Sequence, residues 1–197
     1  MVELPEPTLS SNVSLERTLA SRRSIRSYAK GSLALHEVSQ LMWSAQGITS
    51  SRGFRTAPSA GALYPLELYM VAGEVENLDH GVYRYQSGTH SLVRVKQEDM
   101  RRKVSDAALR QGFVEQGAVV FVLSAIYERT TGKYGQRGVR YIHMEAGHAA
   151  QNLLLQATAL GLGAVPVGAF HDDELAQVLG LAENEHPLYV IPVGPGD

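Results

Sequence analysis

The pattern of apolar residues from Tyr141 to Leu160 is that of one long buried helix. No proline or turn cluster interrupts it, and its apolar residues spread around nearly the whole circumference, which is typical of a helix covered on all sides. Its polar residues fall on one narrow stripe, which consists of Glu145, His148, Asn152 and Gln156. We expect these groups to have partners, because burying them unpaired is costly. Gly161 and Gly163 then end the helix, since glycine readily adopts the left-handed conformation found there.

The segment after this helix, Ala164 to Phe170, is apolar but contains Pro166 and Gly168. Proline cannot donate a hydrogen bond to a neighbouring strand, so this segment is expected to pair only partly with a sheet. Some of its backbone N–H groups would then be free to face a ligand.

Periodic patterns elsewhere predict further helices and the strands of a sheet. The predicted helices are a short one capped by Ser14, residues 36–48, residues 97–111, and a last helix from the cap Asp172 to Leu179, which Gly180 stops. The predicted strands are residues 66–72, 118–125 and 188–193, together with a hairpin of residues 81–85 and 91–95.

Three segments are expected to be irregular. They are an extended arm over residues 1–13, a long loop over residues 50–65 and a mobile linker over residues 126–140. Helices and strands mix without strict alternation. The chain is therefore predicted to be one α+β domain over residues 1–197, with three layers and a mostly antiparallel central sheet.

The composition narrows the classes of protein. With 197 residues, of which 44% are hydrophobic, the chain can bury a sizeable core. The formal charge of -2, from 18 basic and 20 acidic residues, gives no overall attraction for nucleic acid or an anionic membrane. The absence of cysteine excludes disulfides, thiolate nucleophiles and cysteine-bound metal clusters. No signal-peptide pattern or apolar run of about 20 residues is present, so we expect a cytoplasmic protein that binds neither membrane nor nucleic acid.

Several motifs fail on geometry or order. His143 and His148 stand at i and i+5, about 140° apart on a helix, whereas a helical zinc pair needs i and i+4. His143-x-Glu145 resembles part of a zinc deaminase motif, which also requires cysteines. Gly161-x-Gly163 follows a helix instead of a strand, the reverse of a dinucleotide-binding fingerprint. No metal site is expected, and no acyl-transfer or nucleotide-hydrolysis motif is present.

Two segments concentrate hydrogen-bond donors. Residues 21–28 alternate arginine with serine, which favours donors that converge on an anion such as phosphate. A solvated loop after the first helix is the alternative. In the loop 50–65, two prolines and a glycine fix the path of the chain, while Ser59 and neighbouring amides offer hydrogen bonds to a flat or anionic group. An irregular surface connection is the alternative there.

With these segments in this order, the chain resembles the FMN-dependent nitroreductase superfamily. The motifs that look most like its SagB-type, azoline-dehydrogenase branch are Ser21-Arg22-Arg23-Ser24-Ile25-Arg26, Ala57-Pro58-Ser59-Ala60-Gly61-Ala62-Leu63-Tyr64-Pro65 and Glu145-Ala146-Gly147-His148-Ala149-Ala150-Gln151-Asn152. The resemblance spans nearly the whole chain. It implies a nitroreductase-like α/β/α fold, FMN as cofactor, and a homodimer with the flavins between the subunits.

The resemblance also implies which residues would contact the cofactor. Arg22 and Ser24, with the help of Arg23, would bind the phosphate and ribityl chain, and Arg26 would lie at the N1/C2 edge of the flavin. Pro58, Ser59 and Ala60 would lie along the ring and ribityl chain. Val167 and Gly168 would donate backbone N–H groups to N5 and O4. Two departures stand out. Ala62 replaces the asparagine of typical nitroreductases, so a contact to the pyrimidine edge is lost. Residues 194–197 contain no Lys or Arg, where many members place one on the phosphate, so phosphate binding is expected to depend on the first arginine cluster.

Lys133 and Tyr134 resemble the Lys-Tyr pair that azoline dehydrogenases use for proton abstraction, and they are predicted to be catalytic, with a solvated loop as the alternative. The leading function is thus ping-pong hydride transfer through flavin N5, with azoline rings of modified peptides as substrates. Reduction of small nitro or quinone compounds with NAD(P)H is the alternative within this class. Outside it, the alternative is a non-catalytic module that binds a nucleotide or a phosphate group.

Overall fold

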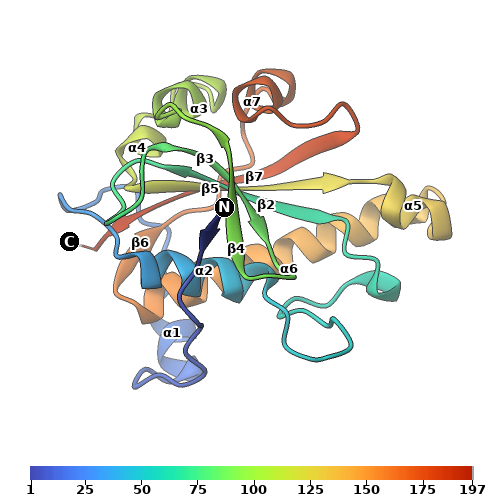
Figure 1. Cartoon of the computed structure of the whole chain (residues 1–197), viewed down its shortest axis with the longest axis horizontal. Coiled ribbons are helices and arrows are strands. Elements are labelled where there is room, and N and C mark those ends of the chain that lie inside the picture. The colour runs from blue at the N-terminus through green and yellow to red at the C-terminus, as the bar shows by residue number, and fades with distance from the viewer. Residues whose placement is uncertain (197) are drawn as a thin grey trace.

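Antiparallel strands form the central sheet of the computed structural model, which describes residues 1–196 (Figure 1). In the order in which they pair, the seven strands are β1 (Val2–Glu3), β4 (Ser91–Lys96), β3 (Gly81–Gln86), β2 (Leu66–Ala72), β5 (Val119–Ile126), β7 (Glu185–Pro195) and β6 (Leu162–Ala164). Every pairing between these strands is antiparallel. The predicted sheet type and the predicted hairpin are therefore confirmed.

Helices cover both faces of this sheet. They are α1 (Leu15–Ser21), α2 (Leu35–Gln46), α3 (Arg101–Ala107), α4 (Gly112–Gln116), α5 (Glu128–Tyr134), α6 (Arg137–Ala159) and α7 (Asp172–Leu179), and a short 3-10 turn, η1, covers Ala60–Ala62. Helices α2 and α6 pack on one face, and α3, α4 and α7 pack on the other (Figure 1). This arrangement confirms the predicted α+β layers.

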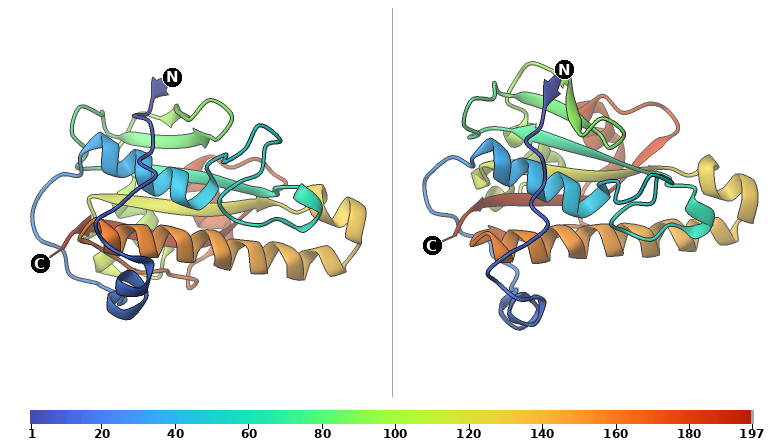
Figure 2. Two further views of the ribbon diagram at one scale, coloured as in Figure 1. Left: turned by 90° about the horizontal axis from the view of Figure 1, so that it is seen from below. Right: turned by 60° about the horizontal axis from the view of Figure 1, so that its bottom comes forward.

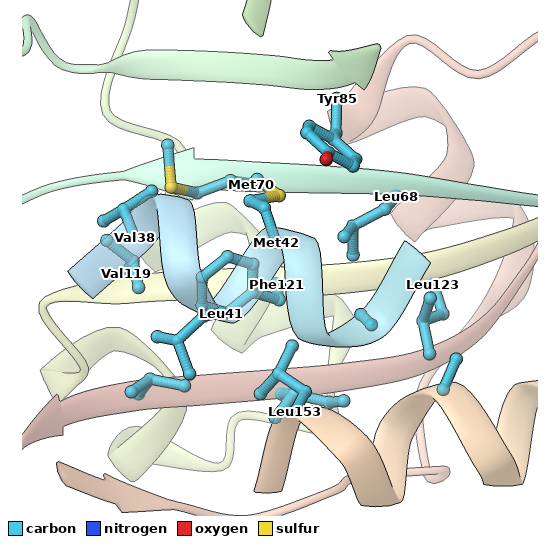
Figure 3. Packing of buried hydrophobic residues seen from close by; sticks show 14 of the residues in the cluster. Val38, Leu41, Met42, Leu68, Met70, Tyr85, Val119, Phe121, Leu123 and Leu153 are labelled. Carbon is cyan, nitrogen blue, oxygen red and sulfur yellow. The ribbon is translucent and has the colours of Figure 1, made fainter. Parts of the chain in front are cut away.

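The continuous apolar run of β5 is buried because its alternate side chains enter two separate cores. Phe121 and Leu123 lie in the cluster formed with α2 and α6, close to Leu153 of α6 (Figure 3). Val120 and Val122 lie in the second cluster, with the side chains of α3, α4 and α7. Strand β5 thus joins the two helical layers.

The long helix α6 differs from its prediction in two respects. It begins at Arg137, earlier than the predicted Tyr141. One side of it is also uncovered: Ala149 and Leu153 are buried, whereas Met144 has 53% of its surface exposed. The prediction of a helix covered on all sides is therefore wrong for a single chain.

The polar stripe of α6 is only partly covered. The Asn152 side chain donates to the carbonyl of Thr56 at 3.3 Å, and the Gln156 side chain accepts from Gln40 at 3.2 Å. His148 is exposed. The expectation of buried partners therefore holds for the second half of the stripe and is wrong for His148.

Several predicted boundaries are wrong. Residues 97–111 form α3 and then a break before α4, because Leu109 and Arg110 adopt left-handed backbone with φ of 58° and 57°. Residues 126–140 are not a mobile linker: most of them belong to α5 and to the first turn of α6, where packing between the two helices outweighs their glycine and threonine content. Strand β7 begins at Glu185, before the predicted residue 188.

The helix ends follow the predictions except at Gly163, which lies in β6 beyond the end of α6, and at Asp172. The Ser14 hydroxyl accepts from the N–H of Arg17 at 3.2 Å, as expected of a cap. Gly161 and Gly180 both have a φ of 73°, which confirms their role at helix ends. Asp172, however, is the first residue of α7, and His171 occupies the cap position.

The amino-terminal arm is extended, as predicted, but its residues Val2 and Glu3 also pair with β4 as strand β1. Gln40 of α2 holds it through two hydrogen bonds to the backbone of Thr8, at 2.8 and 3.0 Å. Within residues 1–196, no helix is long and apolar enough to cross a membrane, and no three His, Cys, Asp or Glu side chains are grouped to hold a metal ion.

Candidate active site

The arginine-serine segment lies against the edge of the sheet, next to β6. The N–H of Ile25 donates to the carbonyl of Ala164 at 3.0 Å. A Cβ on Gly163 would stand 2.8 Å from Ile25, and a Cβ on Gly194 would stand 2.8 Å from the Tyr28 ring. Glycine at these two positions therefore allows the segment to pack closely on β6 and β7.

The donors of this segment face outward and are not neutralised. Arg23, Ser24 and Arg26 are exposed, and Arg22 is partly exposed. Arg26 lies over the Phe113 ring at 5.7 Å, and Arg23 donates to two backbone carbonyls at the end of α1. Among residues 1–196, none of the ion pairs involves these three arginines. An uncompensated group of guanidiniums of this kind fits an anionic ligand.

The turn at Val167 and Gly168 follows the same sheet edge. Val167 forms an isolated bridge with Val190 of β7, in which its N–H donates to the Val190 carbonyl at 2.8 Å. Val167 therefore has no free amide, and its predicted role as a backbone donor to a ligand is wrong. Gly168, one residue further, is exposed, so its amide is the one that remains for such a role.

The Pro58-Ser59-Ala60 loop lies on the amino-terminal half of α6 and has a strained backbone. Gly61 and Ala62 have φ of 64° and 54°, and Tyr64 has a φ of 46°. Left-handed backbone at non-glycine residues costs energy and is concentrated at functional sites. The Ser59 hydroxyl accepts from the N–H of Tyr64 at 2.9 Å, which closes the loop.

Lys133 and Tyr134 lie directly beside this loop, at the end of α5. A Cβ on Gly61 would stand 2.8 Å from the Tyr134 hydroxyl and 3.1 Å from Lys133 Nζ. The Tyr134 ring also packs edge-on against Tyr141 of α6, with 5.2 Å between the centroids. The structure therefore brings the predicted proton-transfer pair and the Pro58-Ser59-Ala60 loop together, although 70 residues separate them in sequence.

Glu145 is a site residue that the sequence analysis did not identify as one. It has 2% of its surface exposed, and its side chain lies beside Ser59. Its Oε1 atom has no partner among the described residues. Burial raises the pKa of Glu145 to about 7, even though Ser59 and the nearby Arg55 favour the charged form. The signal in the sequence was a carboxylate followed by small and apolar residues in the helix.

The two groups of site residues therefore lie far apart in one chain. The arginine segment packs at the end of α6, next to β6, while Ser59 packs on Glu145 near its start (Figure 2). The rise from Glu145 to Ala159 along an α-helix is about 21 Å. This distance is longer than a single side chain can span, so the two groups do not form one compact site within a single subunit.

The fold and these residues define a known class of protein. Residues 19–195 match the family model described as the Nitroreductase family, so the chain belongs to this family of oxidoreductases. A relative from Methanocaldococcus jannaschii, “Putative nitroreductase MJ1384”, is 47% identical over 182 residues, which cover 92% of this chain and 91% of that protein.

Two solved structures are also similar. A crystal structure of a “putative nitroreductase” from Ralstonia eutropha is 29% identical, has a TM-score of 0.87, and is matched over 100% of this chain and 89% of its own. A chain in the Escherichia coli microcin synthetase complex, solved with truncated pro-MccB17 bound, is 25% identical with a TM-score of 0.74, over 98% of this chain and 77% of its own. These matches confirm the nitroreductase resemblance and a distant similarity to peptide-processing proteins.

We predict that Glu145 makes stability depend on pH. Between its ordinary pKa of 4.5 and the raised value of about 7, the folded protein holds a proton that the unfolded chain has released. Raising the pH through this interval should therefore lower the free energy of unfolding, by up to about 3 kcal/mol. Glu145→Gln should remove this dependence and be more stable than the wild type at pH 8. Urea unfolding at pH 5 and pH 8 measures both effects.

The control is Glu183→Gln, which changes an exposed carboxylate. This variant should keep the pH dependence of the wild type. If Glu145→Gln kept it as well, Glu145 would not be protonated in the folded protein.

Proposed function

We propose that this chain is an FMN-dependent oxidoreductase that acts as a homodimer with the flavin between the subunits. The observation that carries the proposal is the separation of the two groups of site residues along α6. In a two-fold dimer with antiparallel α6 helices, the arginine segment of one subunit would lie beside the Pro58-Ser59-Ala60 loop of the other. The site would then be complete only in the dimer.

The residues on the sheet edge fit FMN. Arg22, Ser24 and Arg26 offer uncompensated donors for a phosphate and for an electron-rich ring edge. The five residues from Ala164 to Gly168 span at most about 14 Å of extended chain, a length that suits a phosphate at one end and a ring at the other. When bound, FMN would supply a two-electron acceptor for hydride.

Uncovered apolar side chains support the dimer. Leu15 and Leu19 lie one turn apart on α1 and have 60% and 54% of their surfaces exposed. Met144 of α6 is similarly exposed. Helix α1 stands away from the rest of the chain in Figure 2, and of its residues only Thr18 is buried. Such apolar surfaces are typical of protein–protein contacts.

Lys133 and Tyr134 support azoline oxidation as the reaction. Oxidising an azoline ring removes one hydride and one proton, so a base is needed beside the ring-binding residues. The Tyr134 hydroxyl and Lys133 Nζ stand beside Gly61, on the loop that we assign to the flavin ring. A relative within a microcin synthetase complex, solved with a pro-peptide bound, is consistent with a modified peptide as substrate.

A second candidate is the reduction of nitro or quinone compounds with NAD(P)H. The 47% identity to a protein named as a nitroreductase favours it. Reduction of flavin by NAD(P)H needs no protein base. The two candidates therefore make different demands on Lys133 and Tyr134.

Arg22→Ala should weaken FMN binding by about 1.5–3 kcal/mol, because a charge-assisted hydrogen bond to the phosphate is lost. The Arg22 side chain is partly exposed and forms no ion pair among the described residues, so the far-ultraviolet circular dichroism should not change. Arg17→Ala, in the neighbouring helix α1, is the matched control and should retain flavin like the wild type.

A wild-type protein that is colourless and cannot be reconstituted with FMN would instead support the non-catalytic phosphate-binding module.

Lys133→Ala and Tyr134→Phe should lower azoline turnover by about 10²–10⁴-fold, the usual contribution of general acid–base assistance. The same variants should leave anaerobic flavin reduction by NADPH nearly unchanged. Stopped-flow bleaching of the flavin, with NADPH and separately with a thiazoline peptide, measures both half-reactions. Fast bleaching by NADPH with no response to any azoline would exclude the dehydrogenase and leave the nitroreductase. Azoline oxidation that survives both substitutions would remove Lys133 and Tyr134 from the mechanism.

A further inference from the structure

A polar cavity of about 220 Å³ lies behind the Pro58-Ser59-Ala60 loop. The end of α2, strand β2, the hairpin loop between β3 and β4, and helix α5 form its walls. Its polar lining includes Gln46, Arg55, Glu67, Ser87 and Arg129. None of these residues belongs to the groups that we assign to the flavin or to proton transfer.

Gln46 presents an unused donor to this cavity. Its side-chain oxygen accepts from Arg55 at 2.6 Å, and this contact fixes the orientation of the amide, because a flipped amide would set two donors against each other. Its Nε2 atom is buried and has no partner among residues 1–196, and only 2% of the residue's surface is exposed. Leaving such a donor unpaired costs free energy that a bound acceptor would recover.

Of the charged side chains around the cavity, Arg55 is the one without an ion-pair partner among the described residues. Glu67 and Arg129 form an ion pair at 2.7 Å, so each neutralises the other. Arg55 has no ion pair among the described residues and packs over the Tyr64 ring at 4.6 Å. Burial lowers the pKa of the Arg55 guanidinium, although Glu67 and Glu145 act in the opposite direction. A bound anion would stabilise this partly buried cation.

We propose that this cavity binds a small carboxylate, held by the Arg55 guanidinium and the Gln46 amide N–H. A planar carboxylate can accept from both donors at once, which matches the fork of arginine. The single unpaired positive charge matches a monoanion better than a phosphate dianion. The ligand is either a free small acid or the carboxyl end of a peptide that enters past the hairpin loop. This proposal does not depend on flavin binding.

Such a ligand would act on the candidate active site through Tyr64. The Tyr64 ring packs on Arg55, its carbonyl accepts from Arg129 at 3.2 Å, and its N–H donates to Ser59 at 2.9 Å. The residue that closes the strained loop is thus held by both arginines of the cavity. An occupied cavity would fix the loop in the conformation described here.

The test is calorimetric titration of the purified protein with acetate at constant ionic strength, with chloride as the reference anion. The wild type should bind acetate, and Arg55→Met should bind it at least about tenfold more weakly. Gln46→Glu has the same size and places its own carboxylate against Arg55, so it should abolish acetate binding and raise the melting temperature. Arg52→Met, which changes an exposed arginine on the same loop, should bind like the wild type.

Trialanine with a free or an amidated carboxyl end distinguishes the two sources of the carboxylate. Binding of trialanine with a free carboxyl end, but not of the amidated peptide, would identify a peptide end. Binding of acetate but of neither peptide would identify a small acid. The proposal is contradicted if acetate binds no better than chloride, or if Arg55→Met and Gln46→Glu bind it like the wild type. Phosphate that binds more tightly than acetate and is lost in the same variants would contradict the assignment to a carboxylate.

Discussion

The length and straight course of α6 constrain the candidate active site more than any other feature. Its 23 residues correspond to about 34 Å of helix. The arginine segment packs near one end, through β6, and Ser59 packs on Glu145 near the other. A packed helix cannot shorten to bring the two groups together, and this fixed separation is the reason that we propose a site completed by a second chain. The uncovered side of α6 and the apolar face of α1 are where that second chain would pack.

The sequence predicted the parts of the fold that depend on local patterns. The central strands and the hairpin follow from apolar runs and alternation, and the glycines after α6 and α7 have the φ expected at helix ends. The predictions from sequence failed where tertiary contacts outweigh the local preference of the residues for helix, strand or loop. The segment around Thr130 is rich in glycine and threonine, yet it is helical because it packs against Gly138 of α6. The composition of α6 also did not reveal which of its sides the rest of the chain leaves uncovered.

Part of the candidate site could also be predicted from the sequence. The clustering of Arg22, Ser24 and Arg26 and the loop at Ser59 were visible as concentrations of donors. Their separation was not visible, because it depends on which end of α6 each segment reaches. The loss of the Val167 amide to Val190 and the burial of Glu145 beneath Ser59 are likewise pairings between distant segments. Both change the chemistry of the site, since they remove one donor and add a group that can carry a proton near neutral pH.

Complementation between two variants with impaired flavin binding tests most directly whether two subunits share the site. Arg22→Ala damages the arginine segment, and Pro58→Glu places a charge on the exposed loop at the other end of α6. Each variant alone carries one substitution in every site, so at a flavin concentration that saturates the wild type it should bind much less flavin. A heterodimer of the two, purified through different tags, contains one site with both substitutions and one with neither, so it should bind about one flavin for every two chains. A heterodimer without flavin, or a wild-type monomer that binds FMN, would contradict a site shared between subunits.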